Sequence, residues 1–176
     1  CKELLDLPAA VVLPNGFEND FVPSGSTFLS KRRKARGRLL EVANQLLGTQ
    51  LYDNTLLLAT SGRYEFKNKG IDVYLEALCR LSHDERLKQN VVAFVNVPGW
   101  VGPARQDLQE RLASKRQFDT PLEYPMLTHW LNDMEHDNVL NKLRSCGMDN
   151  RPDQKVRVIF VPCYQDGKDG ILNMHY

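Results

Sequence analysis

The sequence lacks the features that mark membrane proteins, secreted proteins and proteins that coat nucleic acid. No run approaches the roughly 18 apolar residues needed to span a bilayer, and residues 1–6 lack the basic-then-apolar order of a signal peptide. The formal net charge is only +1, so binding to nucleic acid or to an acidic membrane by overall charge is not expected. These absences predict a soluble, cytoplasmic protein without nucleic-acid or membrane partners.

Cysteine is also scarce. The four residues Cys1, Cys79, Cys146 and Cys163 form no Cys-x-x-Cys spacing, which predicts buried free thiols rather than a disulfide framework or a zinc site. The chain begins with Cys instead of Met and stops at His175-Tyr176. We interpret it as an internal piece of a longer protein.

Apolar runs mark the expected strands. A short run at residues 10–13 precedes Pro14-Asn15-Gly16, a strong turn signal. Three further segments are predicted to be buried strands, at residues 55–60, 91–97 and 156–161, and the first two are nearly continuous apolar runs, as is typical of parallel strands covered on both faces.

Segments with apolar residues at intervals of three and four alternate with these strands. They predict helices at residues 26–47, ended by Gly48, and at 71–81, 105–118 and 137–146. The alternation predicts one α/β domain, Rossmann-like, with three layers around a parallel sheet.

A basic segment lies inside the first helix. Residues 31–38 hold six cations, which could bind nucleic acid or an anionic regulator. Because the chain as a whole is nearly neutral, we interpret the segment as a solvated helix face.

The loop at residues 61–70 is the best candidate for a binding site, because ligands of such sheets bind beyond the carboxyl ends of the strands. Arg63 offers a planar fork suited to phosphate, and Lys69 offers a point charge at the entrance of a helix. The loop matches neither the dinucleotide glycine fingerprint nor a P-loop. The alternative is an ordinary solvated loop in which Glu65 neutralises the cations.

The order of residues in this loop resembles a known family. Ser61-Gly-Arg-Tyr-Glu-Phe-Lys-Asn-Lys-Gly70 is similar to the donor-binding loop of glycogen synthases of the animal and fungal type, glycosyltransferase family 3. Three further stretches resemble the family in the same order, namely Pro14-Asn15-Gly16, Thr128-His129 with Leu131 and Asp133, and the strand from Lys155 to Phe160.

The resemblance implies a GT-B enzyme with two Rossmann-like domains. Such an enzyme transfers glucose from UDP-glucose to the non-reducing end of an α-1,4-glucan with retention, and it needs no metal ion or other cofactor. By this match, Arg63 and Lys69 bind the donor diphosphate and stabilise the charge that develops on the leaving group.

Two tyrosines resemble the aromatics that flank the nucleotide base in this family. Tyr164 follows the strand at residues 156–161, and Tyr176 lies twelve positions further on. The family's His and Glu before the first aromatic are Val161 and Cys163 here, so the base contacts and the choice between UDP-glucose and ADP-glucose stay open. The alternative is that both rings pack against the sheet edge.

The resemblance also implies a domain division. Residues 1–23 correspond to the end of the N-terminal domain, and residues 24–176 to the first part of the C-terminal nucleotide-sugar-binding domain. The glutamate-bearing segment Glu-Pro-Trp-Gly-Tyr-Thr-Pro-x-Glu is absent from the sequence, so no catalytic residue is assigned and this piece alone is expected to be inactive. The glucan acceptor would bind the N-terminal domain, and homo-oligomerisation stays open.

Two other groups of residues are weaker candidates for a functional site. His129, Asp133 and His136 would share a face if residues 129–136 were helical, a spacing that suits zinc, although the neighbouring Asn and Asp residues favour turns. Residues 98–100 form a loop that lines a cleft or is held by its Trp. The alternative to an enzyme is a non-catalytic nucleotide-binding or carbohydrate-interaction module that kept this half-fold.

Overall fold

The computed structural model describes residues 6–8, 10, 11, 16 and 18–174. The chain divides into two units, Cys1–Lys34 and Ala35–Tyr176. In the first unit, a short 3-10 helix, η1 (Asn19–Phe21), precedes the start of the helix α2 (Gly25–Leu47). Of the strand predicted at residues 10–13, Ala10 lies in a bend and Val11 has no regular structure, while Val12 and Leu13 fall outside the described residues, as do Pro14 and Asn15.

The second unit is built on a parallel sheet, as predicted. Its strands are β1 (Leu56–Ser61), β2 (Val91–Asn96) and β5 (Val156–Val161), in the order β1-β2-β5. β2 and β5 are buried almost throughout, but β1 is only half covered. The prediction that β1 is buried on both faces was therefore wrong: among the described residues β1 lies at an open edge of the sheet, whereas at the other edge Phe160 of β5 donates its amide to the carbonyl of Met126 at 2.7 Å.

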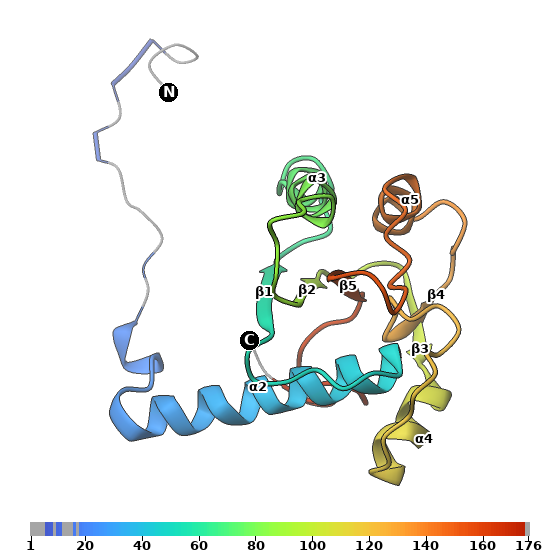
Figure 1. The fold of residues 1–176 in the computed structure, drawn as a ribbon. Helices are drawn as coiled ribbons and strands as arrows, with labels where there is room; N and C mark the ends of the chain where they lie inside the picture. Colours follow the sequence, from blue (N-terminus) through green and yellow to red (C-terminus); the bar gives the residue numbers. More distant parts are fainter. Residues whose placement is uncertain (1–5, 9, 12–15, 17, 175–176) are drawn as a thin grey trace. The chain divides into compact units, whose positions relative to one another are not determined.

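Helices α3 (Ile71–Ser82) and α5 (Asn138–Ser145) lie side by side on one face of the sheet (Figure 1). Alternate strand residues such as Ala93 and Val158 point to this face and pack on the helices. The intervening residues, such as Phe94 and Ile159, join a second cluster on the other face. β2 and β5 therefore each contribute side chains to two hydrophobic cores, one on each face of the sheet.

The second core is covered by the part of α2 from Leu40 to Leu47 and by α4 (Gln106–Ser114). Gly48 ends α2 with a φ of 56°, and a Cβ there would lie 2.0 Å from the carbonyl carbon of Thr120. Only glycine fits this close approach, so the predicted helix stop is confirmed with an added packing reason. The unit is a three-layer, Rossmann-like α/β domain, as the sequence predicts.

A small antiparallel sheet was missed by sequence reasoning. β3 (Val101–Ala104) pairs with β4 (His129–Leu131), where a helical reading of residues 129–136 was one of the alternatives. The helix predicted at residues 105–118 is also shorter than expected. It ends at Ser114 because Lys115 takes a left-handed φ of 53°.

The basic segment within α2 is only partly a solvated face. Residues 31–34 are exposed, but Arg36 donates 2.6 Å hydrogen bonds to the carbonyls of Asp53 and Thr55. Arg38 pairs with Glu41 at 2.7 Å and donates to the carbonyl of Ile171. These two cations join α2 to distant loops and are not available to an anionic ligand.

Among the residues that the structure describes, no helix combines the length and the apolar character that crossing a membrane requires.

Candidate functional site

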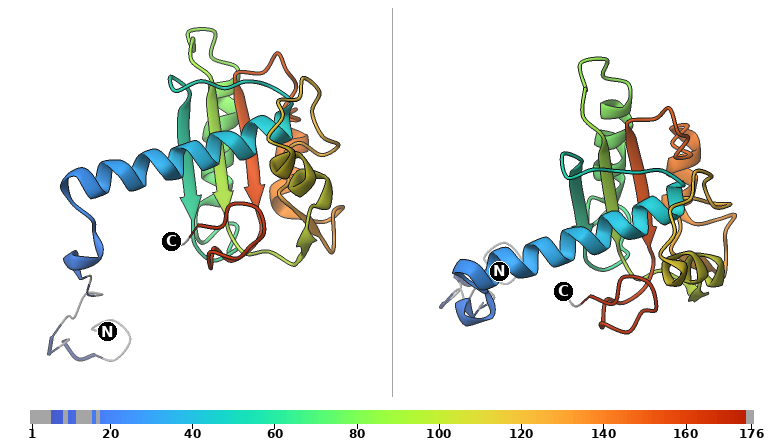
Figure 2. Two further views of the ribbon diagram at one scale, coloured as in Figure 1. Left: turned by 90° about the horizontal axis from the view of Figure 1, so that it is seen from below. Right: turned by 60° about the horizontal axis from the view of Figure 1, so that its bottom comes forward.

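The three parallel strands end level with one another. Ser61 is opposite Asn96, and Asn96 is opposite Val161, so the loops that follow β1, β2 and β5 gather at one edge of the sheet. Figure 2 shows the three arrows pointing the same way, with the loop after β5 at their heads. The loop at residues 62–70 thus lies where the sequence predicts a ligand.

This loop leaves β1 through Gly62, whose φ of 142° disfavours any residue with a Cβ. The chain then forms a compact turn, in which the amide of Lys69 donates to the carbonyl of Glu65 at 2.9 Å. The amide of Gly70 donates to the carbonyl of Lys67 at 3.0 Å. The loop is therefore an ordered structure that leads directly into α3.

Tyr64 fixes the loop to the rest of the sheet edge. Its ring meets Phe160 edge-on at 5.9 Å, and its hydroxyl donates to Asp137 Oδ2 at 2.7 Å and accepts from the amide of Val139 at 3.1 Å. Burial, followed by the hydrogen bond to Asp137, raises the pKa of Tyr64 well above its usual range. Tyr64 is thus a neutral phenol that holds the loop in place, a role that sequence reasoning missed.

Arg63 points outward from this fixed loop. Its side chain is 78% exposed, and Nε pairs with Glu65 Oε1 at 3.1 Å. Within the described part of the chain, the other guanidinium N–H groups have no partner. Glu65 therefore engages one side of the guanidinium and leaves the terminal fork open for an anion.

Lys69 is exposed at the end of the same loop, one helical turn from Glu65. Two amides at the start of α3 already have partners within the protein. The amide of Asp72 donates to the carbonyl of Phe66 at 3.2 Å, and that of Val73 donates to Asp72 Oδ1 at 2.9 Å. Side-chain charge, more than backbone N–H groups, is thus what the loop presents to a ligand.

The loops after the other two strands add exposed aromatic rings. Tyr164 is 73% exposed and Trp100 is 72% exposed. Tyr164 does not pack against the sheet edge, which was the alternative to a role in base binding. Tyr176 lies outside the described residues.

A cavity of about 260 Å³ opens beside the loop at residues 62–70. Trp100 and Tyr64 line it together with Asp133, His136 and Asp137. At the end of β2, the side-chain oxygen Oδ1 of Asn96 is buried without a partner among the described residues. This edge therefore combines exposed cations, aromatic surface and carboxylates.

The zinc arrangement considered from sequence does not form. His129 lies in β4, whereas His136 Nδ1 pairs with Asp133 Oδ2 at 3.0 Å. Within the described ranges, the group of three possible metal ligands is a different one, His129, Cys163 and Asp169, whose ligand atoms lie within 4.8 Å of one another.

These three side chains are already hydrogen-bonded. His129 Nε2 donates to the carbonyl of Asp169 at 2.9 Å, and its Nδ1 lies 2.9 Å from the Thr128 hydroxyl. Burial lowers the pKa of His129, so the ring is neutral and Nδ1 accepts the Thr128 proton. Both ring nitrogens are thus occupied.

The carboxylate and the thiol of this group are engaged as well. Asp169 accepts from the amides of Ile171, Leu172 and Asn173 at 2.7 to 2.9 Å. Burial raises the pKa of the Cys163 thiol to about 12, so it is protonated. The group stabilises the loop after β5 and does not fit a metal site.

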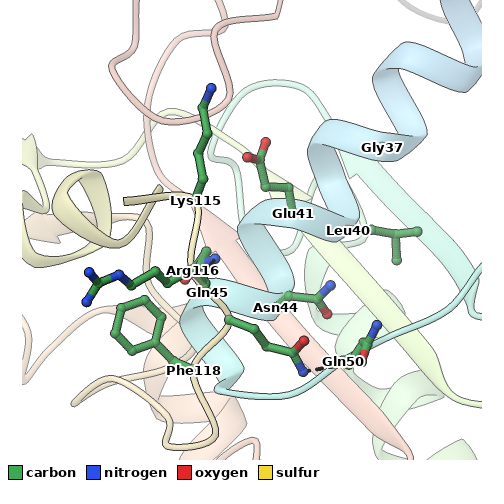
Figure 3. A pocket seen from close by; sticks show the side chains of 10 residues that line it. Gly37, Leu40, Glu41, Asn44, Gln45, Gln50, Lys115, Arg116 and Phe118 are labelled. Carbon is green, nitrogen blue, oxygen red and sulfur yellow. Dashed lines mark hydrogen bonds between the residues drawn. The ribbon is translucent and has the colours of Figure 1, made fainter. Parts of the chain in front are cut away.

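A larger cavity, of about 480 Å³, lies away from the strand ends, between the end of α2 and residues 115–118 (Figure 3). Its amides mostly bond within the protein: Gln45 Nε2 donates to the carbonyl of Arg116 at 2.8 Å, and Gln117 Nε2 donates to Gln50 Oε1 at 3.3 Å. We interpret this cavity as a polar junction between α2 and the segment after α4.

A comparison with models of protein families shows to which family the chain belongs. The model described as "Glycogen synthase" matches residues 4–120, about two thirds of the chain. The chain belongs to the glycogen synthase family. This match includes Arg63 and Lys69, and it ends before the stretch that begins at Thr128 and before Tyr164.

Curated relatives agree with the family assignment. Glycogen [starch] synthase isoform 2 of Saccharomyces cerevisiae is 27% identical, and the alignment covers 70% of this chain and 26% of the relative. Glycogen [starch] synthase of Neurospora crassa is 28% identical, covering 70% and 25%, and that of Dictyostelium discoideum is 33% identical, covering 50% and 11%. The chain spans about a quarter of the length of the first two relatives.

Proposed function

We propose that the protein transfers glucose from UDP-glucose to the non-reducing end of an α-1,4-glucan with retention, as a glycogen synthase of the GT-B type. In this proposal residues 24–176 belong to the domain that binds the nucleotide sugar, and residues 1–23 to the crossover from an N-terminal domain that binds the glucan. Family membership and the position of the loop at residues 62–70 support this proposal.

The observation that carries it is the pair of exposed cations, Arg63 and Lys69, at the carboxyl edge of the sheet. Cleavage of the glycosidic bond leaves negative charge on the departing diphosphate. Fixed cations stabilise that charge most in the transition state, where it develops. The two side chains therefore bind the diphosphate and assist its departure, without a step that requires a metal ion.

Tyr164 has a secondary role in this proposal. An exposed ring beside the strand ends can stack on the uracil base, while the diphosphate lies against Arg63. Because Arg63 is held to one side by Glu65, its open fork is oriented before the donor arrives.

The proposal is tested by calorimetric titration of the full-length protein with UDP. We expect Arg63→Ala and Lys69→Ala each to weaken binding by about 10- to 100-fold, as expected for loss of a charge-assisted hydrogen bond. Their folded structure should be unchanged, because both side chains are exposed.

Two matched variants control for charge alone. Lys67→Ala removes a cation of the same loop that the diphosphate assignment does not use, and Arg80→Ala removes an exposed arginine near the far end of α3. Both should bind UDP almost as the wild type does. Equal UDP affinity in all four variants would contradict the assignment of Arg63 and Lys69 to the diphosphate. UDP binding without glucosyl transfer would favour a non-catalytic nucleotide-binding module.

A further inference from the structure

Two thiols from distant parts of the sequence meet on the face of the sheet that α3 and α5 cover. Cys79 lies in the last turn of α3, and Cys146 is the residue that caps the end of α5. Both side chains are half-buried and pack against the same core cluster. The two helices lie side by side (Figure 1), and Ser82 at the end of α3 lines the same cavity as Cys146 at the end of α5.

The thiols are close enough to interact. Glu76 lies one turn before Cys79 on α3, Lys142 lies one turn before Cys146 on α5, and these two side chains bond at 2.7 Å, so the two free cysteines lie on facing sides of the helices. Burial, and then the contact with Cys146, raises the pKa of Cys79 to about 11, so Cys79 carries its proton at neutral pH.

Two charged groups face this pair. Lys142 Nζ bonds Glu76 Oε2 at 2.7 Å, and its charge interacts with both Cys79 and Cys146. The ammonium favours the thiolate form of Cys79, whereas the Glu76 carboxylate opposes it. A cation beside paired thiols is the environment in which thiol exchange proceeds.

The two cysteines differ in access. Cys146 lines a cavity of about 470 Å³, which Ser82 and His83 line from the end of α3 and Gln154 from the loop before β5. Cys79 is not among the residues that line this cavity. A small reagent that enters it therefore meets Cys146 first.

We propose that Cys79 and Cys146 form a redox-active dithiol, in which Cys146 reacts first with a low-molecular-weight disulfide and Cys79 then completes an intramolecular disulfide. In the first step the Cys146 thiolate attacks one sulfur of the reagent, whose S–S bond breaks and releases one thiolate that takes up the proton lost by Cys146. In the second step Cys79 loses its proton and attacks the Cys146 sulfur, which expels the second thiolate. Two protein thiols are oxidised and one disulfide is reduced to two thiols.

The bond would join the carboxyl ends of α3 and α5. It closes a long loop of the chain, so the oxidised protein should unfold at a temperature roughly 5 to 10 °C higher than the reduced protein. The pair lies at the end of α3 opposite to Lys69, so UDP affinity should change little on oxidation. This site is therefore independent of the proposed diphosphate site.

The test is incubation of the full-length protein with oxidised glutathione, followed by mass spectrometry of alkylated peptides. We expect a cross-linked pair of peptides that contain Cys79 and Cys146, reversed by a dithiol reductant. In a Cys1→Ser/Cys163→Ser background, the cross-linked peptides should weigh about two mass units less than the sum of the two reduced peptides, and Cys79 and Cys146 should resist alkylation together.

Single substitutions in this background establish the order of the steps. Cys79→Ser should trap one glutathionyl group on Cys146, whereas Cys146→Ser should leave Cys79 to react about tenfold more slowly or not at all. A stable glutathione adduct on Cys146 with Cys79 still present, or no modification of either residue in the wild type, would overturn the proposal. So would equal reactivity of the two single variants.

Discussion

Two groups of chemically active side chains follow the strand ends of this domain, and they behave in opposite ways. Arg63 lies two residues beyond β1 and is exposed, with one ion pair to Glu65. Cys163 lies two residues beyond β5 and is buried within the group that it forms with His129 and Asp169. Residue type alone would favour the second group as a site.

The two groups differ in whether their polar atoms are free to bind a ligand. The His129 group uses its nitrogen and oxygen atoms in internal hydrogen bonds, so a ligand would have to break them. The loop at residues 62–70 is held by Tyr64 instead, so its exposed cations are not needed to hold the loop in place. A support residue distinct from the proposed binding residues, Arg63 and Lys69, is what distinguishes the proposed site from the structural cluster.

The largest expected effect is on stability, at Asp169. Asp169→Ala removes the acceptor for three backbone amides, and we expect the free energy of unfolding to fall by about 2 to 3 kcal/mol. Urea denaturation followed by circular dichroism measures this change. UDP affinity of the folded variant should stay within about twofold of the wild type.

Asp166→Ala is the matched control for that change. Asp166 is exposed and, among the described residues, accepts a hydrogen bond only from the amide of Lys168, at 2.8 Å, so its loss should cost less than about 1 kcal/mol. If both variants were equally stable, the His129 group would not be the structural cluster described above.

A smaller effect on stability is expected when the pH is changed, because of the protonation of His129. Burial lowers the pKa of His129 in the folded protein, so the unfolded chain binds the proton more readily, near its ordinary value of about 6.5. The contribution of neutral His129 to the free energy of unfolding is therefore present above about pH 6.5 and is lost as the pH falls below that value. Between pH 7.5 and 5.5 the wild type should lose up to about 1 kcal/mol of unfolding free energy.

His129→Gln should reduce this dependence on pH, whereas His83→Gln should retain it, because His83 is exposed. Denaturation midpoints at the two pH values give the comparison. A His129→Gln protein with the wild-type pH slope would show that His129 is not held neutral by burial.

The layered fold could be predicted from the sequence because its signals are strong and local. The continuous apolar runs of β2 and β5 and the periodicity of α3 correspond to buried faces. β3 and β4 were missed because strands of four and three residues, one of them holding Gly102 and Pro103, carry no periodic pattern.

The site was predicted only in part, for a physical reason. The edge at which residues 62–70 lie follows from the order of the elements, and the importance of Arg63 and Lys69 follows from family resemblance. The contact of Tyr64 with Asp137 and the contact of Arg36 with two carbonyls join residues far apart in sequence, and no local pattern records them. Such contacts depend on the folded arrangement itself.

The most direct test of the central claim compares two ligands that differ by one phosphate. Calorimetric titration of the full-length protein should show UDP binding about tenfold or more tightly than UMP, because the added phosphate reaches Arg63 and Lys69. In the Arg63→Ala/Lys69→Ala variant the account predicts that the two affinities converge. An undiminished preference for UDP in that variant would contradict it and place the diphosphate elsewhere.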